Sequence, residues 1–174
     1  MNIQIRNENF KDPADVAAIH RITERAFRDA PHTDHNEQFI VDALRRSGAL
    51  TLSVVAAIDG ELIGHAAISP VTISAGSKNW FGLGPVSVLP EFQRRGTGSQ
   101  LINCVLAELK EQGAAGCVVL GDPEFYGRFG FKIIAGLLFP EAPPEYFQAL
   151  VFRGEAPQGA VVYHPAFYGD VSES

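Results

Sequence analysis

Hydrophobic residues recur along parts of this chain with the two-residue period that is typical of strands. The pattern marks residues 2–6, 50–58 and 62–73 as strands. Asp59 and Gly60, between the last two runs, tolerate positive φ and favour a two-residue hairpin turn. We therefore predict that segments 50–58 and 62–73 pair as antiparallel neighbours.

A period of three to four residues marks helices between the first and second of these strands. Asp12 and Pro13 are the residue types of a helix cap and a first helical position. Asp34 and Glu37 have the spacing of a capping box at the start of the next helix, and Gly48 is placed to end it. The apolar stripes of these helices are Val16, Ile19, Thr23 and Ala26, followed by Phe39, Ile40, Ala43 and Leu44.

The second half of the chain predicts a strand, a crossover helix and a parallel strand. Residues 80–89 form an apolar run that Gly84 and Pro85 interrupt. Because proline donates no backbone hydrogen bond, this pair predicts a bulge that splays the strand. Helical spacing then continues to Gly113, and residues 116–120 have the uniform apolar character of a buried strand.

The remaining segments complete the sheet in this prediction. Asp122 and Pro123 start a short helix that runs through Tyr126, and residues 146–152 and 160–163 supply the last strands. A polar tail follows position 169.

Size and composition indicate a single globular domain spanning residues 1–174. The chain is 46% hydrophobic and 20% charged, and its length suits one core. No apolar run approaches the roughly 20 residues of a membrane span. The first residues lack the basic patch and apolar stretch of a secretory signal. We therefore expect a cytoplasmic protein without membrane association.

Cysteine usage and net charge exclude further classes of protein. Cys104 and Cys117 are the only cysteines, which is too few for a disulfide framework, and they lack metal-ligand spacing. We therefore expect no metal. The net charge of −6 disfavours broad binding to nucleic acid. The oligomeric state stays open, with a homodimer among the options.

The strongest functional signal is a glycine-rich turn between the strand at 80–89 and the next helix. Its residues are Gln93, Arg94, Arg95, Gly96, Thr97 and Gly98, followed by Ser99. The first amides of a helix have no intrahelical partner and lie at the positive end of its dipole, so they bind anions such as pyrophosphate. The alternative is that the glycines only form a tight turn and that the arginines are solvated.

Two motifs in this order resemble those of the GNAT family of N-acetyltransferases. The family pattern of Gln or Arg, two residues, Gly, one residue, then Gly or Ala is matched by Gln93, Gly96 and Gly98. Its Tyr-x-x-x-Gly-Phe segment is matched by Tyr126, Gly130 and Phe131. The likeness covers almost the whole chain, and it is closest to the small bacterial YhbS-like branch. That resemblance rests also on the segments 84–90 and 120–123 and on the tail from Tyr163 to Phe167.

The resemblance implies an α/β fold with a mixed, mostly antiparallel, splayed central sheet flanked by helices. Other nucleotide-binding motifs are not supported: the run from Gly82 to Ser87 lacks the third glycine of a Rossmann turn, and no P-loop is present.

The resemblance also implies acetyl-CoA as co-substrate and a place for it. The pantetheine arm is expected beside the opened backbone of Val86, Ser87 and Val88, and the pyrophosphate on the amides of 94–99. Tyr126 falls where the family often places the tyrosine that protonates the departing sulfur. Its alternative role is as one member of an aromatic cluster with Phe125, Phe129 and Phe131.

The general base is not legible from the sequence, because residues 80–89 contain no acidic side chain. The candidates are Glu37, Asp122, His65 and Glu24, and each has a structural explanation as a capping partner, a helix cap, a strand residue or a solvated charge. Glu37 leads, as base or as amine-binding group, because the first helix-loop-helix of this fold usually borders the acceptor site.

We therefore expect an acetyl-CoA-dependent N-acetyltransferase that acts by direct attack on the thioester. The acceptor would be a primary amine of a small molecule or a peptide. Two alternatives stay open: a CoA-binding sensor or interaction module without catalysis, and a protein-lysine acetyltransferase.

Overall fold

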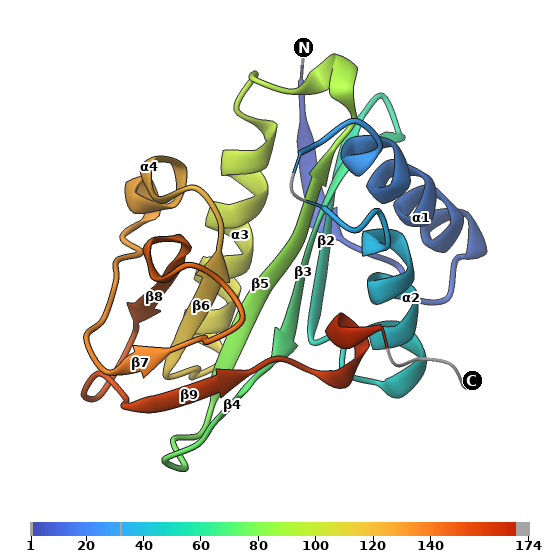
Figure 1. Cartoon of the computed structure of the whole chain (residues 1–174). Helices are drawn as coiled ribbons and strands as arrows, with labels where there is room; N and C mark the ends of the chain where they lie inside the picture. The colour runs from blue at the N-terminus through green and yellow to red at the C-terminus, as the bar shows by residue number, and fades with distance from the viewer. Residues whose placement is uncertain (1, 32, 170–174) are drawn as a thin grey trace.

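The fold is built on one twisted sheet with helices on both faces (Figure 1). The computed structural model describes residues 2–31 and 33–169. The sheet order is β1-β2-β3-β5-β6-β8. The strands are β1 (Gln4–Asn7), β2 (Leu52–Ile58), β3 (Glu61–Pro70), β5 (Trp80–Val88), β6 (Gly116–Leu120) and β8 (Phe147–Val151).

Strand directions confirm the predicted mixed sheet. The β2–β3 hairpin is antiparallel and turns at Asp59 and Gly60, both of which have positive φ. Every neighbouring pair in this sheet is antiparallel except β5 and β6, which are parallel and joined by a crossover helix.

The predicted splay lies at Gly84 and Pro85. Pairing of β5 with β6 ends at Leu83, opposite Val119. On its other edge β5 stays paired with β3 through Val88, but the register shifts by one residue across Gly84 and Pro85. The extra residue is a β-bulge. Beyond it, β5 and β6 separate, and one edge of β5 is left without a neighbouring strand among the described residues.

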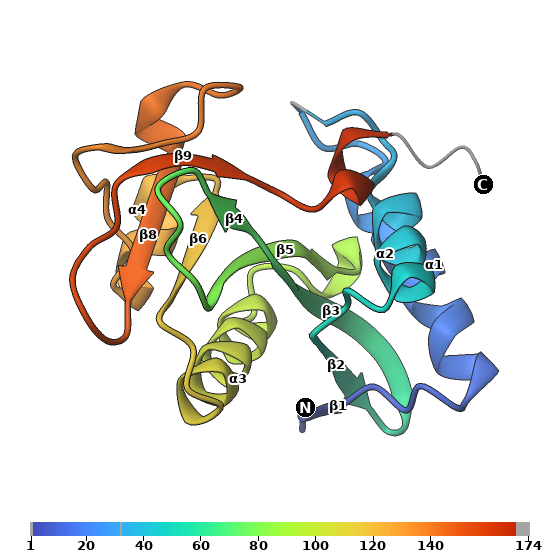
Figure 2. The ribbon, with the colours of Figure 1, turned by 90° about the horizontal axis from the view of Figure 1, so that it is seen from below.

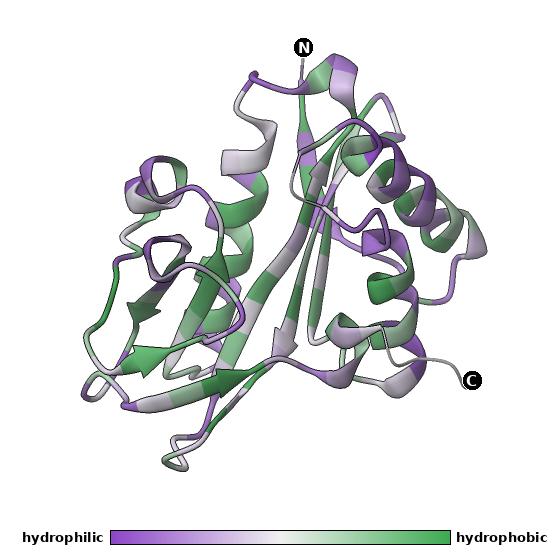
Figure 3. Ribbon diagram, in the orientation of Figure 1, coloured by the Kyte–Doolittle hydropathy of each residue, from purple (hydrophilic) through white to green (hydrophobic). Residues whose placement is uncertain are grey.

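The helices form two layers around the sheet (Figure 2). Helices α1 (Pro13–Phe27) and α2 (Glu37–Ser47) cover one face, and α3 (Thr97–Glu111) covers the other. Hydrophobic residues gather on the strands, and hydrophilic residues on α1 and the loops (Figure 3). The core therefore lies on both faces of the central strands.

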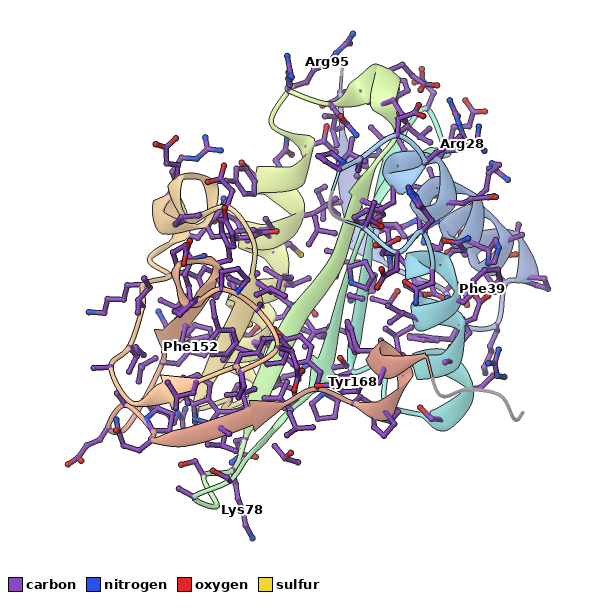
Figure 4. The ribbon with its side chains drawn as sticks, viewed as in Figure 1. Arg28, Phe39, Lys78, Arg95, Phe152 and Tyr168 are labelled. Atoms are coloured by element: carbon purple, nitrogen blue, oxygen red, sulfur yellow. The ribbon has the colours of Figure 1, made fainter. Side chains whose placement is uncertain are left out.

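The stripes predicted for the first two helices need correction. Helix α1 buries Ile19 and Thr23 as predicted. Its inward face also includes Ala18 and Ile22, whereas Val16 and Ala26 are only half-buried. Phe39 was expected in the core, yet it is 54% exposed and points away from the sheet (Figure 4). A ring at this position packs at the edge of His20 on the neighbouring helix instead.

The predicted capping box is also wrong, because helix α2 begins two residues later than a box from Asp34 to Glu37 would need. Its cap is Asn36, which makes no side-chain cap hydrogen bond. The carboxylate of Glu37 instead accepts a hydrogen bond from the Thr33 hydroxyl. At the other end Gly48 ends the helix in the left-handed region, as predicted.

Of the two last strands predicted, β8 joins the central sheet, whereas β9 (Gly159–Val162) belongs to a second small sheet. The predicted strand at 62–73 breaks after Pro70, and β4 (Thr72–Ile73) pairs with β9. β9 also pairs with β7 (Leu137–Leu138), which was not predicted. After β9 the chain crosses to α2, where it forms a short 3₁₀ turn, η4 (Pro165–Tyr168) (Figure 2).

The short helix α4 (Pro123–Tyr126) is present as predicted. Within the described ranges, no helix has the length and apolar character needed to cross a bilayer. The predicted polar tail after position 169 lies outside the described residues.

Candidate functional site

The opened edge of β5 presents backbone groups toward the gap between β5 and β6. The Leu89 amide donates to the Ile63 carbonyl of β3 at 2.9 Å. Alternate residues of a paired strand direct their backbone groups to the same side. Ser87 therefore faces β3, whereas Val86 and Val88 face the gap. The Val88 carbonyl accepts a hydrogen bond from the Gln93 side chain at 2.9 Å, which leaves the amides of Val86 and Val88 for a ligand.

The start of α3 holds further unpaired amides. Gly96 has a φ of +84° and caps the helix, and the Gln100 amide donates to its carbonyl. The amides of Thr97, Gly98 and Ser99 have no hydrogen-bond acceptor within the described part of the chain. Three adjacent donors at the positive end of a 15-residue helix form a site for an anion.

A hollow of about 310 Å³, the helix-end pocket, adjoins these amides. Val88 is part of its lining, so the pocket reaches from the start of α3 to the end of the free edge of β5. Arg94 and Arg128 both line it. Arg95 extends outward near the Phe92 ring (Figure 4). The pocket is lined by Val88, Phe92, Gln93, Arg94, Gly96, Gly98, Ser99, Phe125 and Arg128.

Tyr126 stands on α4, beyond the carboxyl end of β6. Its ring packs against Phe125, Phe129 and Phe131, with centroid separations of 5.0, 6.5 and 5.9 Å. Burial raises the pKa of Tyr126 to about 12, so the phenol keeps its proton at neutral pH. The cluster and a proton-donor role are therefore compatible, because the rings fix the tyrosine without engaging its hydroxyl in any hydrogen bond among the described residues.

Both the sequence and the fold of this chain are matched by known proteins. Residues 10–134 match the sequence profile of the Acetyltransferase (GNAT) domain. The chain belongs to the GNAT acetyltransferase family. As a member it is an acyltransferase, and its sheet shows the mixed, splayed form of the GNAT fold.

Individual members of the GNAT family are similar to this chain in sequence and structure. The Escherichia coli protein named uncharacterized N-acetyltransferase YhbS is 37% identical over 124 residues, which is 71% of each chain. The crystal structure of YhbS with CoA superposes with a TM-score of 0.85 at 33% identity, covering 97% of this chain and 93% of that one. A GNAT acetyltransferase from Brucella melitensis, crystallised with acetyl-CoA, is 49% identical with a TM-score of 0.83, covering 95% and 98%.

A second hollow, the apolar pocket, lies on the other side of the splay in this GNAT fold. Its volume is about 260 Å³, and Gly84, Pro85 and Leu120 border it where β5 and β6 separate. Most of its wall is hydrophobic or aromatic. The pocket is lined by Phe27, Glu37, Ile40, Leu83, Gly84, Pro85, Leu120, Phe139, Tyr163, Phe167 and Tyr168.

Glu37 is the carboxylate of this wall. The Thr33 hydroxyl donates to its Oε2, and Oε1 is shielded from solvent without a hydrogen-bond partner among the described residues. A shielded carboxylate oxygen is costly unless a donor or a cation meets it. The side chain is therefore poised for a ligand rather than for the helix cap that its position suggested.

The other base candidates, Asp122, Glu24 and His65, are not part of the lining of the apolar pocket. Asp122 caps α4 by accepting a hydrogen bond from the Glu124 amide at 3.0 Å. Glu24 is exposed on α1. His65 is fully buried, and burial, together with the nearby Arg45 charge, lowers its pKa to about 3. It is therefore neutral at physiological pH.

His65 belongs to a buried polar chain under the first two helices. Arg45 pairs with Glu8, and the Ser53 hydroxyl donates to Glu8. The Ser53 hydroxyl has one proton and gives it to Glu8. Its oxygen therefore accepts a hydrogen bond from His65 Nε2, at 2.8 Å. The arrangement ties the β1 end, α2 and the central strands together.

Sequence reasoning missed the aromatic wall of the apolar pocket and the part played by Arg128. Phe139, Tyr163, Phe167 and Tyr168 belong to segments without local motif character, although Tyr163 and Phe167 lie in the tail that resembles YhbS. Arg128 lies inside the Tyr-x-x-x-Gly-Phe segment. Its positive charge in this glycine-containing segment was the sequence signal that could have marked it as a pocket residue. No cluster of residues with metal-ligand character occurs in the described ranges.

Proposed function

We propose that this chain, acting as one domain, transfers an acetyl group from acetyl-CoA to a primary amine of a small molecule or a peptide. The observation that carries the proposal is the continuous set of unpaired backbone amides along Val86, Val88 and the start of α3. Such a set fits a ligand with an amide-bearing arm and a pyrophosphate. The CoA and acetyl-CoA complexes of the two similar proteins support the same assignment.

In this proposal each group of the site binds one part of the co-substrate. The amides of Val86 and Val88 donate hydrogen bonds to the arm, which binds like an added strand, and Ser87 between them holds β5 to β3. The amides of 94–99 hold the pyrophosphate. Gln93 fixes the turn through Val88. Arg94 and Arg128, which line the helix-end pocket, add positive charge around the phosphates, and Arg95 adds its charge from outside the pocket lining.

Acetyl-CoA, when bound, supplies an acetyl group activated as a thioester. In the transfer the amine nitrogen forms a bond to the acetyl carbon and the carbon–sulfur bond breaks. An acceptor that arrives as an ammonium first gives one proton to a base, for which Glu37 is the candidate, and so becomes the neutral nucleophile. The attacking amine then loses a second proton as the carbon–nitrogen bond forms, and the departing sulfur gains one. Tyr126 donates the proton to sulfur in this proposal, because its raised pKa keeps it protonated and its ring is held beside the end of β6.

The test is Tyr126→Phe, which keeps the ring packing and removes the proton donor. Turnover should fall by about 10²-fold, whereas acetyl-CoA affinity and thermal stability should change little. Steady-state thiol release, calorimetry and thermal unfolding measure the three quantities. Wild-type turnover in the variant, with chemistry shown to limit the rate, would return Tyr126 to a packing role.

A screen of thiol release separates this function from the alternatives. Amines, amino acids, polyamines and lysine peptides are offered with acetyl-CoA. Turnover of a small amine supports the proposal, and turnover of lysine peptides alone supports a protein acetyltransferase. Tight CoA binding without turnover of any acceptor would favour a CoA-binding sensor. The absence of acidic residues from β5 is consistent with that alternative.

A further inference from the structure

The apolar pocket combines an aromatic wall with a single carboxylate. Phe27, Phe139, Tyr163, Phe167 and Tyr168 surround the space, and Glu37 is the charged group among the described lining residues. These residues come from α1, α2, the loop after β7 and the segment that crosses after β9. The pocket therefore closes around a small ligand from several directions.

From this combination we infer the chemical class of the acceptor, resting on the proposed function. The acceptor is a small primary monoamine with a compact aromatic or branched apolar body. Its ammonium is bound by Glu37, and its body lies against the aromatic wall.

Charge balance argues for one positive group and no negative one. An ammonium beside Glu37 supplies the partner that Oε1 lacks. The carboxylate of an amino acid would meet no cation among the described lining residues, and it would lie near Glu37. The second ammonium of a diamine would lose water against hydrocarbon without a second carboxylate.

Size and shape argue for a compact body. A volume of about 260 Å³ lies below the usual range for drug-sized ligands. Aromatic side chains favour edge and offset contacts with another ring, and such contacts add to the free energy of burial. An extended peptide carrying a lysine would leave its main-chain amides beside these rings.

A hydrogen bond from Thr33 holds the side chain of Glu37 in place. Thr33 belongs to the loop before α2, and its hydroxyl accepts from the His35 amide while donating to Glu37 Oε2. One carboxylate oxygen is thereby held, and the other is left for the ligand. Because Gly84 and Pro85 border the same pocket, an amine bound by Glu37 lies beside the splay that receives the thioester.

The experiment measures binding to CoA-saturated protein by calorimetry. The probe is 2-phenylethylamine, and three compounds are compared with it. L-Phenylalanine adds a carboxylate, 2-phenylethanol removes the charge, and 1,4-diaminobutane is the diamine. The probe should bind about tenfold tighter than each of the others. Equal or tighter binding of the amino acid or the diamine would overturn the inference.

Two variants assign the charge recognition to Glu37. Glu37→Gln should weaken 2-phenylethylamine about tenfold or more and leave 2-phenylethanol and CoA unchanged. Glu111→Gln, at an exposed position on α3, removes the same charge and should change none of the three. If Glu37→Gln does not fold, Thr33→Val removes the anchoring hydroxyl and should weaken the amine selectively. An equal loss for amine and alcohol would contradict a charge-specific role.

Thiol release separates the failure of this inference from that of the proposed function. Binding of 2-phenylethylamine without turnover of any amine would leave the acceptor class intact and overturn acetyl transfer. Turnover of diamines or lysine peptides, with no binding or turnover of the monoamine, would leave acetyl transfer intact and overturn the acceptor class.

Discussion

At the scale of single residues, the site depends on positions where a side chain is missing. Gly121 lies just after β6, and a Cβ there would come within 2.6 Å of Tyr126 Cε2. The ring of Tyr126 thus occupies the space that glycine leaves. Gly98 differs, because a Cβ there would meet only Val88 Cγ2, at 4.0 Å. The first glycine positions a tyrosine, and the second keeps open the approach to the amides of α3.

Replacing Gly121 should displace Tyr126. Gly121→Ala forces the ring to move, so we expect a loss of about 1–3 kcal/mol in the free energy of unfolding and a fall in turnover. Gly127→Ala is the matched control, since its Cβ would meet nothing within 4 Å and its φ is −58°. Chemical denaturation and thiol release measure both effects. Unchanged turnover in a folded Gly121→Ala protein would contradict the role of ring placement.

Replacing Gly98 should block the anion site without unfolding the chain. Gly98→Glu places bulk and negative charge beside the amides of Thr97 and Ser99, so CoA affinity should fall below detection by calorimetry. Because a Cβ at this position is tolerated, thermal unfolding should change little. Gly98→Ala separates bulk from charge and should retain more CoA affinity than Gly98→Glu. Wild-type CoA affinity in the glutamate variant would move the pyrophosphate elsewhere.

At the scale of elements, the bulge in β5 divides that strand into two functions. Before Gly84 the strand is paired on both edges, to β3 and to β6. After Pro85 it is paired to β3 alone, and its alternating backbone directs every second residue to the gap. One strand is therefore paired on both edges along its first half and leaves one edge of hydrogen-bond groups without a partner strand along its second half, among the described residues.

Hydrogen exchange should resolve this alternation residue by residue. Without ligand, the amides of Val86 and Val88 should exchange rapidly, and the amide of Ser87 should be protected by its pairing with β3. Acetyl-CoA should slow exchange at Val86 and Val88 and leave Ser87 nearly unchanged, so Ser87 is an internal control. Strong protection of all three amides in the ligand-free protein would contradict the open edge.

At the scale of the whole molecule, distant parts of the chain meet at the splay. Helices α1 and α2 near the start of the chain contribute Phe27, Glu37 and Ile40 to the apolar pocket. The crossing segment after β9 contributes Phe167 and Tyr168 and reaches α2, where His164 lies 3.5 Å from the Ser47 hydroxyl. The same helices cover the buried chain of Arg45, Glu8, Ser53 and His65. Helix α2 therefore contributes both to the wall of the apolar pocket and to the buried polar chain.

The buried histidine should make the protein sensitive to acid. The pKa of His65 is about 3 in the folded chain and near 6.5 when unfolded, so the unfolded state binds an extra proton between these values. Stability should therefore fall as pH decreases from 6.5 toward 3, by up to about 1.4 kcal/mol per pH unit from this residue. Urea unfolding across this range measures the slope.

A variant and a spectroscopic measurement check the origin of the slope. His65→Gln should flatten the dependence in this range, and in the wild-type protein the ring should stay neutral by NMR at pH 5. The lowered pKa of Asp15, held chiefly by hydrogen bonding from Arg6, adds a loss only at lower pH, near and below its usual value of 3.8. A protonated His65 ring at pH 5 in the folded protein would refute the assignment.

The sequence alone determined the features that depend on a few neighbouring residues. Periodicity located nearly every helix and central strand, Gly84 and Pro85 predicted the bulge, and the turn at Gly96 predicted unpaired amides, because each depends on local backbone preferences. Tyr126 and its aromatic neighbours were likewise visible as one short segment.

Only the tertiary structure decided which residues meet across the fold. Phe39 has the spacing of a core residue yet faces outward, because the orientation of α2 depends on the sheet it packs against. β9 joined β4 in a second sheet, since strand pairing is a long-range choice that alternation cannot specify. The apolar pocket brings Glu37 beside Tyr168 for the same reason: its walls are separated by most of the chain, and only packing brings them together.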